Sequence, residues 1–534
     1  MNDSTNQTTS NQTTSNQTTS NQTTSNQTTK NRLWIQVATT LGSGMVFIDN
    51  TVVTIALPVM QGEWGVSSVS VQWVVQAFAL FLSSLILVGG SLGDQLGRKR
   101  MFLIGVVSFA IASIFCGLAT NTTQLITAQA IKGMGGALLL PCSLAILSTA
   151  FDESERGRAI GTWSAFTSIT AAVGPVLGGW LVENVSWRAV FFMTTPFAIV
   201  VVLLTLLHVP ESRNQETDDS QQIDWLGALL ATSGIGSIIY GLTVASQQTL
   251  TAPWAWRPFA AGIVLLCLFV WQESTQEAAS RNPMMPLSLF RSRAFSGANV
   301  LTIFLYSALG ALFYFLPFNL IQVQGYSPTA TGAVLLPLIL MIFALSRWTG
   351  GLVAQYGAKR LLMLGPCITA IGFALLAVPG IGGSYWTTFF PAIAVMGFGM
   401  AFFIAPLTTT VMNSVSTQSS GVASGINNAA SRAASLLGIA LFSIFMTSTF
   451  NASLDSQLAP LDLPNAVLLA IDEQRGNLAA AELPVSVTST LPTEVVNHIT
   501  QAIDLAFVAG YRINMLIAAA LAVVSAFCAW WLIE

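Results

Sequence analysis

The sequence predicts an all-α polytopic membrane protein with fourteen transmembrane helices. Only 8% of its 534 residues are charged and 53% are hydrophobic, whereas about a quarter of the residues of a soluble domain are charged. Apolar stretches of about 20 residues recur from Trp34 to the C-terminus, and each is long enough to cross a bilayer as a helix. A backbone exposed to lipid must satisfy its own hydrogen bonds, which favours helices.

Residues 1–33 form a polar N-terminal tail. Positions 6–30 are five units of NQTTS, the last of which ends in Lys30. A low-complexity polar segment cannot bury enough apolar surface to fold, so we expect this tail to be disordered. We expect no cleaved signal peptide, because neither a basic segment nor a small-residue cleavage site precedes the first apolar run.

Glycine, proline and charged residues separate the predicted helices. The expected spans are 34–60, 70–93, 99–120, 122–149, 157–182, 187–208, 223–246, 257–273, 295–322, 328–354, 359–380, 385–413, 420–449 and 506–532. They predict an N-terminal six-helix bundle (34–209), two inserted helices with their linkers (210–294) and a C-terminal six-helix bundle (295–534). The long connection 450–505 within the last part contains four prolines and is mostly acidic.

Lysine and arginine residues predict the orientation in the membrane. With the N-terminus inside, thirteen of the twenty Lys and Arg residues fall on the cytoplasmic side, three fall outside and four lie within spans. Loops rich in Lys and Arg stay in the cytoplasm. We therefore expect a multi-pass protein of the plasma (inner) membrane, with both termini in the cytoplasm and 450–505 outside.

One charged segment occurs twice. GGSLGDQLGRKR (89–100) and TGGLVAQYGAKR (349–360), offset by 260 positions, are identical at six of twelve positions, and each follows the second helix of a six-helix set. The repeat indicates two parallel six-helix halves, which is an architecture of secondary transporters.

The first copy of this segment is a candidate gating loop. Its glycines permit a tight turn, and Asp94 lies at the membrane boundary, where it can accept hydrogen bonds from a helix N-terminus or an arginine. A plain positively charged anchor is the alternative, although an anchor needs no fixed spacing of Asp94 and glycines. The candidate residues are Gly90, Leu92, Gly93, Asp94, Gly97, Arg98, Lys99 and Arg100.

The pattern G-x-L-x-D-x-x-G-R-K in this loop resembles the signature between helices 2 and 3 of the major facilitator superfamily. The second copy has Ala354 in place of Asp94 and is degenerate. FIDNTVVTIALP (47–58) resembles the helix-1 motif of the fourteen-helix drug:proton antiporter branch of that family, the multidrug-resistance efflux type. The resemblance implies the major facilitator fold, in which this loop holds the two halves together and gates the conformational change.

GTWSAFTSITAAVGPVLGGW (161–180) resembles the helix-5 antiporter motif of the same branch, with Thr170 in place of a usual glycine. Glycine and proline in a buried membrane helix permit close packing and a kink, and ordinary helix packing is the alternative role. The matching residues are Gly161, Gly174, Pro175, Gly178 and Gly179.

Ionisable residues at membrane depth are functional candidates because their burial is costly. Asp49 lies about 22 Å into the first helix, where it can bind a proton or make a structural hydrogen bond. In the fourth helix the family has an arginine at the position of Gln129, and Lys132, three residues later, shares that face. The resemblance places both helices at the central cavity, so Asp49 and Lys132 can pair; a lysine that snorkels to the interface is the alternative.

Span 420–449 contributes the remaining cavity candidates. Arg432 lies about 18 Å from the inner end of its helix, near the midplane, and Asn427 and Asn428 lie one turn before it. An arginine there needs an acid, backbone carbonyls or an anionic ligand, and a structural role is the alternative. Lys132 and Arg432 outnumber Asp49 at depth, which favours neutral or anionic amphiphiles as substrates unless pairing with Asp49 cancels the effect.

These observations predict a secondary active transporter and not an enzyme: a proton-coupled antiporter that exports small amphipathic compounds by alternating access. No lysine is followed by Ser or Thr, so no P-loop is present and ATP does not drive transport from this chain. The alternatives are a transporter or exchanger of an organic anion or another physiological solute, and an antiporter-like subunit of a respiratory complex.

The expected partners follow from this function. They are a small-molecule amphipathic substrate, the proton as coupling ion and the lipid bilayer; we expect no nucleic acid, and we expect a monomer. The five cysteines lie singly in apolar runs and the two histidines are far apart, so we expect no metal site and no cofactor.

Overall fold

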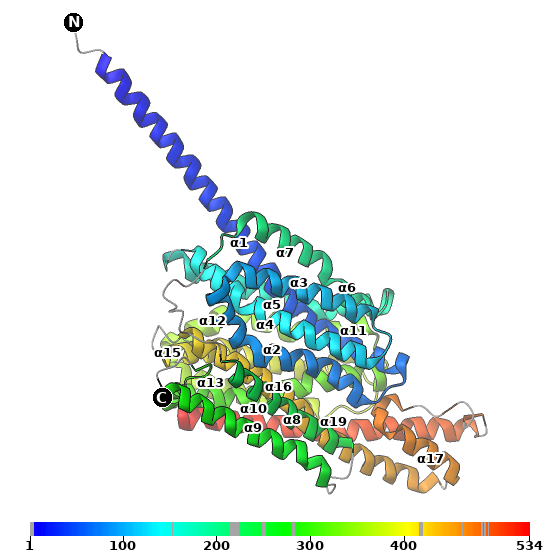
Figure 1. Cartoon of the computed structure of the whole chain (residues 1–534). Coiled ribbons are helices and arrows are strands. Elements are labelled where there is room, and N and C mark those ends of the chain that lie inside the picture. Colours follow the sequence, from blue (N-terminus) through cyan, green and yellow to red (C-terminus); the bar gives the residue numbers. More distant parts are fainter. Residues whose placement is uncertain are drawn as a thin grey trace.

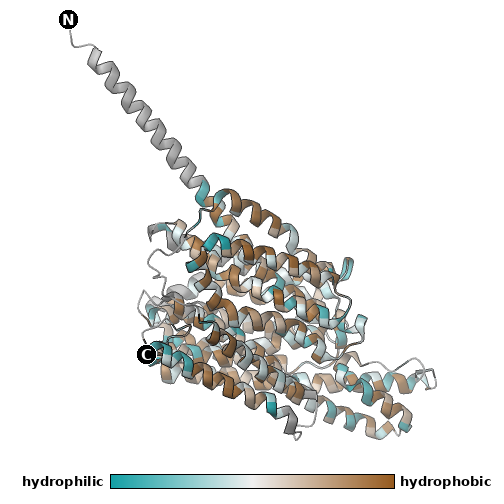
Figure 2. Cartoon of the chain, in the orientation of Figure 1, coloured by the Kyte–Doolittle hydropathy of each residue, from teal (hydrophilic) through white to brown (hydrophobic). Residues whose placement is uncertain are grey.

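In a computed structural model of the chain, the described residues fold into helices without any β-strand (Figure 1). The structure describes residues 5–151, 153–212, 224–247, 253–279, 283–415, 420–461, 463–481, 484, 488–489 and 491–533. Hydrophobic residues predominate in the middle of the helices and hydrophilic residues are more frequent at their ends (Figure 2), as expected for helices that cross a bilayer.

The helices have the following bounds. The first set is α1 (Thr5–Trp64), α2 (Ser68–Leu96), α3 (Arg98–Leu118), α4 (Thr122–Ala150), α5 (Glu153–Asn184), α6 (Ala189–Phe192) and α7 (Thr194–His208). Next come α8 (Trp225–Gln247), α9 (Pro253–Ala278) and the 3-10 helix η1 (Leu287–Arg291). The last set is α10 (Arg293–Phe318), the π-turn η2 (Asn319–Val323), α11 (Pro328–Val334), α12 (Leu336–Tyr356), α13 (Ala358–Leu376), α14 (Tyr385–Thr388), α15 (Phe390–Asn413), α16 (Ser420–Leu458), η4 (Ala459–Leu461), α17 (Asn465–Gln474), η5 (Arg475–Ala480) and α19 (Thr493–Leu532).

Most of these helices correspond to the predicted spans, but α16 continues to Leu458 and α19 begins at Thr493, so both extend into the predicted connection 450–505. Thirteen helical stretches among the described residues are long and apolar enough to cross a membrane, and α5, with 32 residues, occupies the predicted span 157–182. Three predicted spans are each divided in two: α6 with α7, α11 with α12, and α14 with α15. The predicted all-α polytopic fold is confirmed.

The N-terminal helix extends beyond its predicted span. α1 begins at Thr5, so it includes the NQTTS units that we expect to be disordered. Once a helix is nucleated, each further residue adds a hydrogen bond at little cost, which lets the apolar part of α1 extend into a polar segment. The side chains of residues 5–30 lie outside the described part of the chain, and disorder of the tail stays a prediction.

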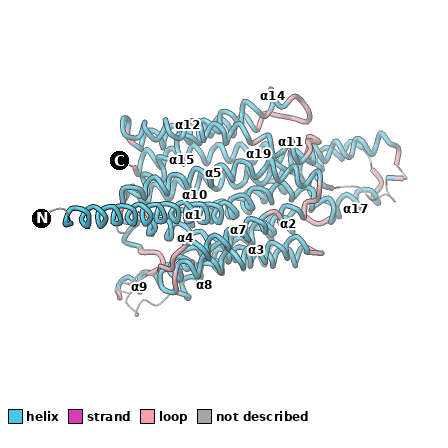
Figure 3. The backbone as a smooth tube through the Cα atoms, turned by 90° about the horizontal axis from the view of Figure 1, so that it is seen from above, coloured by secondary structure: helices cyan, strands magenta, loops and turns pink. Residues whose placement is uncertain are grey.

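The helices form two bundles. In the N-terminal bundle α4 packs against α2 and α3, and α1 packs against α5 and α7; in the C-terminal bundle α10 and α13 pack against α19, and α15 packs against α12 and α13. Both chain ends lie at one end of the molecule and α17 at the other (Figures 1 and 3). We call the end with the α2–α3 turn the motif side and the end with α17 the loop side.

The inserted helices lie against both bundles. α8 packs on α9 and also on α2 and α16. Its contact with the two bundles is a small apolar cluster that includes Leu80 of α2, Ile239 of α8 and Ala440 of α16. The helices α8 and α9 are therefore not a detached hairpin. A movement of either bundle would change the contacts of α8.

The two bundles meet closely on the loop side, where α5 lies against α11. A Cβ atom added to Gly332 would lie 2.0 Å from the carbonyl oxygen of Pro175, and one added to Gly179 would lie 2.2 Å from that of Pro328. Helices without side chains at the contact can approach closely. These glycines thus set the distance between the bundles.

Hydrogen bonds accompany this contact on the same side. The Tyr314 hydroxyl donates to the Ser68 carbonyl (3.2 Å), and the Ser443 hydroxyl donates to Gln72 Oε1 (3.1 Å). The Thr329 amide donates to Glu183 Oε2 (3.2 Å). These contacts join the two bundles on the loop side.

A methyl group at Gly332 should hold the two bundles apart on the loop side. We expect Gly332→Ala to destabilise the α5–α11 contact by about 1–3 kcal/mol. The added Cβ overlaps the carbonyl oxygen of Pro175, which cannot rotate away. The measurement is the cross-linking yield of a cysteine pair placed at Glu183 and Thr329 in a chain without its native cysteines. Gly62→Ala is the control, since no atom lies within 4 Å of its Cβ position; equal yields in the two variants would contradict the prediction.

Candidate functional site

The candidate site is centred on an ion pair between α1 and α4. Lys132 Nζ lies 3.0 Å from Asp49 Oδ1, to which it donates a hydrogen bond, and 2.8 Å from Oδ2. Asp49 is 1% exposed and Lys132 is fully buried. Asp49 is about midway along the part of α1 that crosses the bundle, and Lys132 extends from the middle of α4, so the two helices hold the charges at membrane depth.

Aromatic rings surround the lysine. The Lys132 ammonium lies 4.9 Å from the ring centre of Phe191, 5.5 Å from that of Phe78 and 5.7 Å from that of Phe109. These rings come from α6, α2 and α3. An ammonium over ring faces gains cation–π attraction, while the same rings keep water away from the pair.

The Asp49 carboxylate can either pair with the Lys132 ammonium or bind a proton. Removing two charges from water is costly, and only their close contact offsets the cost. If Asp49 binds a proton, Lys132 is left as an unpaired buried charge, and the helices that hold it are destabilised until it moves or finds a new partner. Protonation of Asp49 would therefore change the packing of the N-terminal bundle.

The pair lies elsewhere than the resemblance implied. We expect Asp49, Gln129 and Lys132 at the central cavity, but the structure encloses all three inside the N-terminal bundle. The physical reason is that Phe78, Phe109 and Phe191 fill the space around Lys132. Gln129 is buried too, and its Oε1 faces the Cys116 thiol at 3.8 Å.

The α16 candidates form a separate group. The Asn427 amide donates to Asn299 Oδ1 (3.1 Å) and to the Thr302 hydroxyl (2.8 Å), both on α10. Asn428 is exposed. Arg432 is half-buried, and Tyr306 of α10 is the residue with which its charge interacts. The structure brings these residues near α10, not near Asp49.

The gating-loop candidates form a tight connection. Gly97 has φ +111° and Gly357, its counterpart in the second copy, has φ +79°, so both repeats need glycine at the same position of the turn. The Lys99 amide donates to Glu211 Oε1 (3.0 Å), and the Arg98 amide donates to the Ser212 carbonyl (3.0 Å). The loop is thus tied to the segment after α7.

The other residues of the loop pack against α4 or face outward. A Cβ on Gly93 would lie 2.6 Å from the Cys142 sulfur, and one on Gly90 would contact Pro141 at 3.5 Å. Leu92 packs against the N-terminal core, and Arg100 is exposed. The side chain of Asp94 lies outside the described residues. Sequence reasoning missed Glu211, because its partners are backbone amides, which leave no pattern in the sequence.

The helix-5 glycines have two different neighbours. Gly174 and Gly178 face Thr51 and Val52 of α1, while Gly179 faces α11 of the other bundle. Pro175 presents its carbonyl to Gly332. Gly161 has no atom within 4 Å of its Cβ position. The motif therefore provides close packing within the N-terminal bundle and between the bundles.

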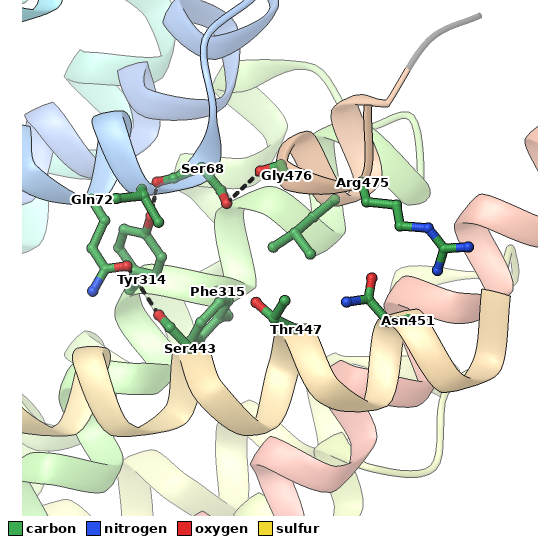
Figure 4. A pocket seen from close by; sticks show the side chains of 11 residues that line it. Ser68, Gln72, Tyr314, Phe315, Ser443, Thr447, Asn451, Arg475 and Gly476 are labelled. Carbon is green, nitrogen blue, oxygen red and sulfur yellow. Dashed lines mark hydrogen bonds between the residues drawn. The ribbon is translucent and has the colours of Figure 1, made fainter. Parts of the chain in front are cut away.

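A polar pocket lies where both bundles meet the long loop (Figure 4). Its volume is about 290 Å³. Gln72, Tyr314, Ser443, Thr447, Asn451 and Arg475 are among the residues that line it. The sequence did not single them out, because they come from four separate segments and form no local pattern.

The loop after α16 closes this pocket. The Ser68 hydroxyl donates to the Gly476 carbonyl (2.8 Å), and the Gln61 amide donates to the Asn477 carbonyl (3.2 Å). Arg475 holds this part of the loop by donating hydrogen bonds to Asp455 and Asp472. The predicted external loop therefore contacts the N-terminal bundle as well as its own.

Two six-helix bundles in one chain, one of which encloses a buried ion pair, are an architecture of secondary transporters. Residues 39–439 match the model of the Major Facilitator Superfamily. The chain belongs to this superfamily, as its charged loop and helix-1 motif predict.

Similar proteins come from several bacteria. The chain is 34% identical over 516 residues to the multidrug resistance protein Stp of Mycobacterium tuberculosis (94% of this chain, 91% of the relative). It is 29% identical over 509 residues to the multidrug efflux pump LfrA of Mycolicibacterium smegmatis (93% and 95%). It is 29% identical over 506 residues to the tetracenomycin C resistance and export protein of Streptomyces glaucescens (92% and 89%).

Solved structures share the fold at low sequence identity. A bacterial homologue of the human lysosomal transporter Spinster, in an inward-facing conformation, has a TM-score of 0.62 at 18% identity and covers 93% of this chain and 97% of its own. The POT family transporter PepTSo has a TM-score of 0.63 at 14% identity (94% and 97%).

Removing one partner of the Asp49–Lys132 pair should destabilise the protein more than removing both. We expect Asp49→Asn or Lys132→Met to cost about 3–5 kcal/mol, because each leaves an unpaired buried charge, and the double variant to recover most of that loss. Thermal unfolding of the four purified proteins in lipid nanodiscs measures this double-mutant cycle. Additive losses in the double variant would show that the two charges do not depend on each other.

Proposed function

We propose that the protein is a proton-coupled antiporter that exports small amphipathic compounds by alternating access. The observation that carries this proposal is the Asp49–Lys132 pair, fully enclosed in the N-terminal bundle of a transporter fold. The relatives whose names describe multidrug resistance, efflux or export support the direction of transport.

Asp49 is the proposed proton-binding group. Its carboxylate can be neutralised by a proton or paired with Lys132, and the two states differ in net charge inside an apolar site. Because an unpaired charge there is costly, proton binding weakens the α1–α4 contact and favours rearrangement of the bundle. Release of the proton restores the pair. This cycle supplies the two states that alternating access needs.

The contacts on the loop side indicate which end of the molecule is joined in this structure. If both termini are cytoplasmic, as the Lys and Arg distribution predicts, the side joined by Gly179, Gly332 and the loop is extracytoplasmic. The gating loop, tied to Glu211, then lies on the cytoplasmic side. We propose that opening of the glycine contact and reordering of this loop, including Asp94, accompany export, and that residues 34–209 and 295–534 move as the two halves.

The charges at depth favour neutral or anionic amphiphiles over cations. Lys132 neutralises Asp49, and Arg432 has no acidic partner among the described residues. A half-buried guanidinium beside Tyr306 can bind a carboxylate or a phenolate through charge-assisted hydrogen bonds. Uptake or exchange of an organic anion is the alternative that this arginine also supports. The family match argues against a respiratory-complex subunit.

We further propose a monomer in the plasma (inner) membrane, with no cofactor, and with the proton as coupling ion. Each bundle is complete within one chain, since both halves of the pseudo-repeat are present. The inserted helices 210–294 complete the lipid-facing surface beside α2 and α16.

Loss of the Asp49 carboxyl group should abolish proton-driven export. In an efflux-deficient bacterial host, we expect protonophore-sensitive efflux of at least one amphiphile by the unmodified protein, and a loss of about 100-fold or more in Asp49→Asn at equal membrane levels, because proton transfer groups contribute on that scale. Ser43→Ala is the control: it removes another α1–α4 contact, the 2.7 Å hydrogen bond to Ser143, without removing a titratable group. Undiminished efflux by Asp49→Asn would place the coupling group elsewhere.

Replacement of Arg432 should change the charge preference. We expect Arg432→Gln to weaken the apparent affinity for anionic amphiphiles by about tenfold, which corresponds to one charge-assisted hydrogen bond, and to leave cationic compounds nearly unaffected. Export assays over a panel of anionic, neutral and cationic compounds measure this. Arg432→Lys, which keeps the charge, should retain part of the anion preference; an equal loss for all compounds would indicate a structural role.

A further inference from the structure

Two carboxyl groups meet at the motif-side end of the inserted helices. Asp224 immediately precedes α8, and Glu273 lies near the end of α9. Glu273 is fully buried and Asp224 is 8% exposed. Their carboxyl groups lie close together beside Gly227 of α8. Neither residue belongs to the site around Asp49, and no motif in the sequence pointed to them.

Each carboxyl group has one oxygen that is already occupied. Asp224 Oδ1 accepts hydrogen bonds from the Gly227 amide (2.7 Å) and from Gln272 Nε2 (3.0 Å). Glu273 Oε2 accepts one from the Met285 amide (2.7 Å). These bonds fix both groups, because two of the three donors belong to the backbone.

The two remaining oxygens face each other. Asp224 Oδ2 and Glu273 Oε1 are buried and have no donor among the described residues. Both lie beside Gly227, where an added Cβ would be 2.3 Å from Asp224 Oδ2 and 2.7 Å from Glu273 Oε1. The glycine leaves the space in which the carboxyl groups come together.

This geometry requires a proton. Two carboxylates in contact, away from water, cannot both be ionised. In the described part of the chain no cation contacts the pair. On the adjoining elements, Glu277 lies one turn further along α9 and interacts with Arg291 of η1. A proton between Asp224 and Glu273 is what satisfies both free oxygens.

We propose that Asp224 and Glu273 form a second proton-binding site, in which one shared proton fastens α8 and α9 to the segment that leads into α10. The proton joins three parts of the chain: the start of α8, the end of α9 and the backbone at Met285. Since α8 packs on α2 and α16, the site controls how firmly the inserted pair is held beside both bundles. It is independent of Asp49 and of the direction of transport.

The test compares Glu273→Gln with Glu277→Gln. A glutamine at 273 can donate its amide hydrogen to Asp224 and so keeps the contact without a titrating proton. Glu277 is a matched control: it also lies at the end of α9 and accepts backbone hydrogen bonds, from Leu287 and Ser288, but it touches no other carboxyl group.

The readout is thermal unfolding of the purified full chain in lipid nanodiscs from about pH 6 to about pH 9. The folded protein holds a proton that the unfolded chain releases at neutral pH, so its stability falls as the pH rises. We expect the unfolding temperature of the unmodified protein and of Glu277→Gln to fall by a few degrees over this range. In Glu273→Gln we expect most of this pH-dependent decrease in unfolding temperature to be absent. An unchanged pH dependence in Glu273→Gln would overturn the proposal.

Infrared spectroscopy provides a measurement that does not depend on a stable variant. The unmodified protein at neutral pH should show the carbonyl band of a buried protonated carboxyl group that disappears at alkaline pH. Glu273→Gln and Asp224→Asn should each lack this band, while Asp49→Asn and Glu277→Gln should retain it. Its absence from the unmodified protein at neutral pH would overturn the proposal, even if Glu273→Gln fails to fold.

Discussion

The hydrocarbon core of the membrane neither donates hydrogen bonds nor screens charge, and the structure depends on this constraint. Backbone groups are satisfied within helices, and the buried ionisable side chains of two sites lie against partners. Lys132 contacts Asp49 and three aromatic rings; Glu273 contacts Asp224 and a backbone amide. In both places a carboxyl group is held where its charge is costly, and we propose that its protonation state is coupled to the packing around it.

Glycine determines where the helices touch. At Gly97 and Gly357 it allows the same turn in both halves, whereas at Gly179 and Gly332 it lets the halves approach on the loop side. Apolar side chains of both bundles, among them Leu57 of α1 and Phe315 of α10, belong to one buried cluster, so separation of the bundles exposes apolar surface to water or lipid. The charged loop at the other end is tied to Glu211 instead. We propose that the two ends of the molecule are opposite gates. Close backbone contacts at glycines join one end, and hydrogen bonds to a carboxylate hold the other.

The two buried acid sites belong to different parts of the chain. One lies within a six-helix bundle, where a change in charge alters the contact between α1 and α4. The other holds the inserted pair, and α8 is the element that touches both bundles. A proton at the first site is proposed to act on the transport cycle, while a proton at the second acts on the stability of the surrounding helices.

The sequence by itself determined the helical membrane fold, the internal repeat and the family, because apolar length, charge placement and short motifs are local properties. It also indicated Asp49, Lys132 and Arg432, since charge at membrane depth is rare. Only the tertiary structure decided that Asp49 and Lys132 are sealed inside one bundle instead of lining a cavity, and that Asp224 meets Glu273. Those outcomes depend on which side chains from distant helices fill the space around a group, and packing of that kind has no signature along the chain.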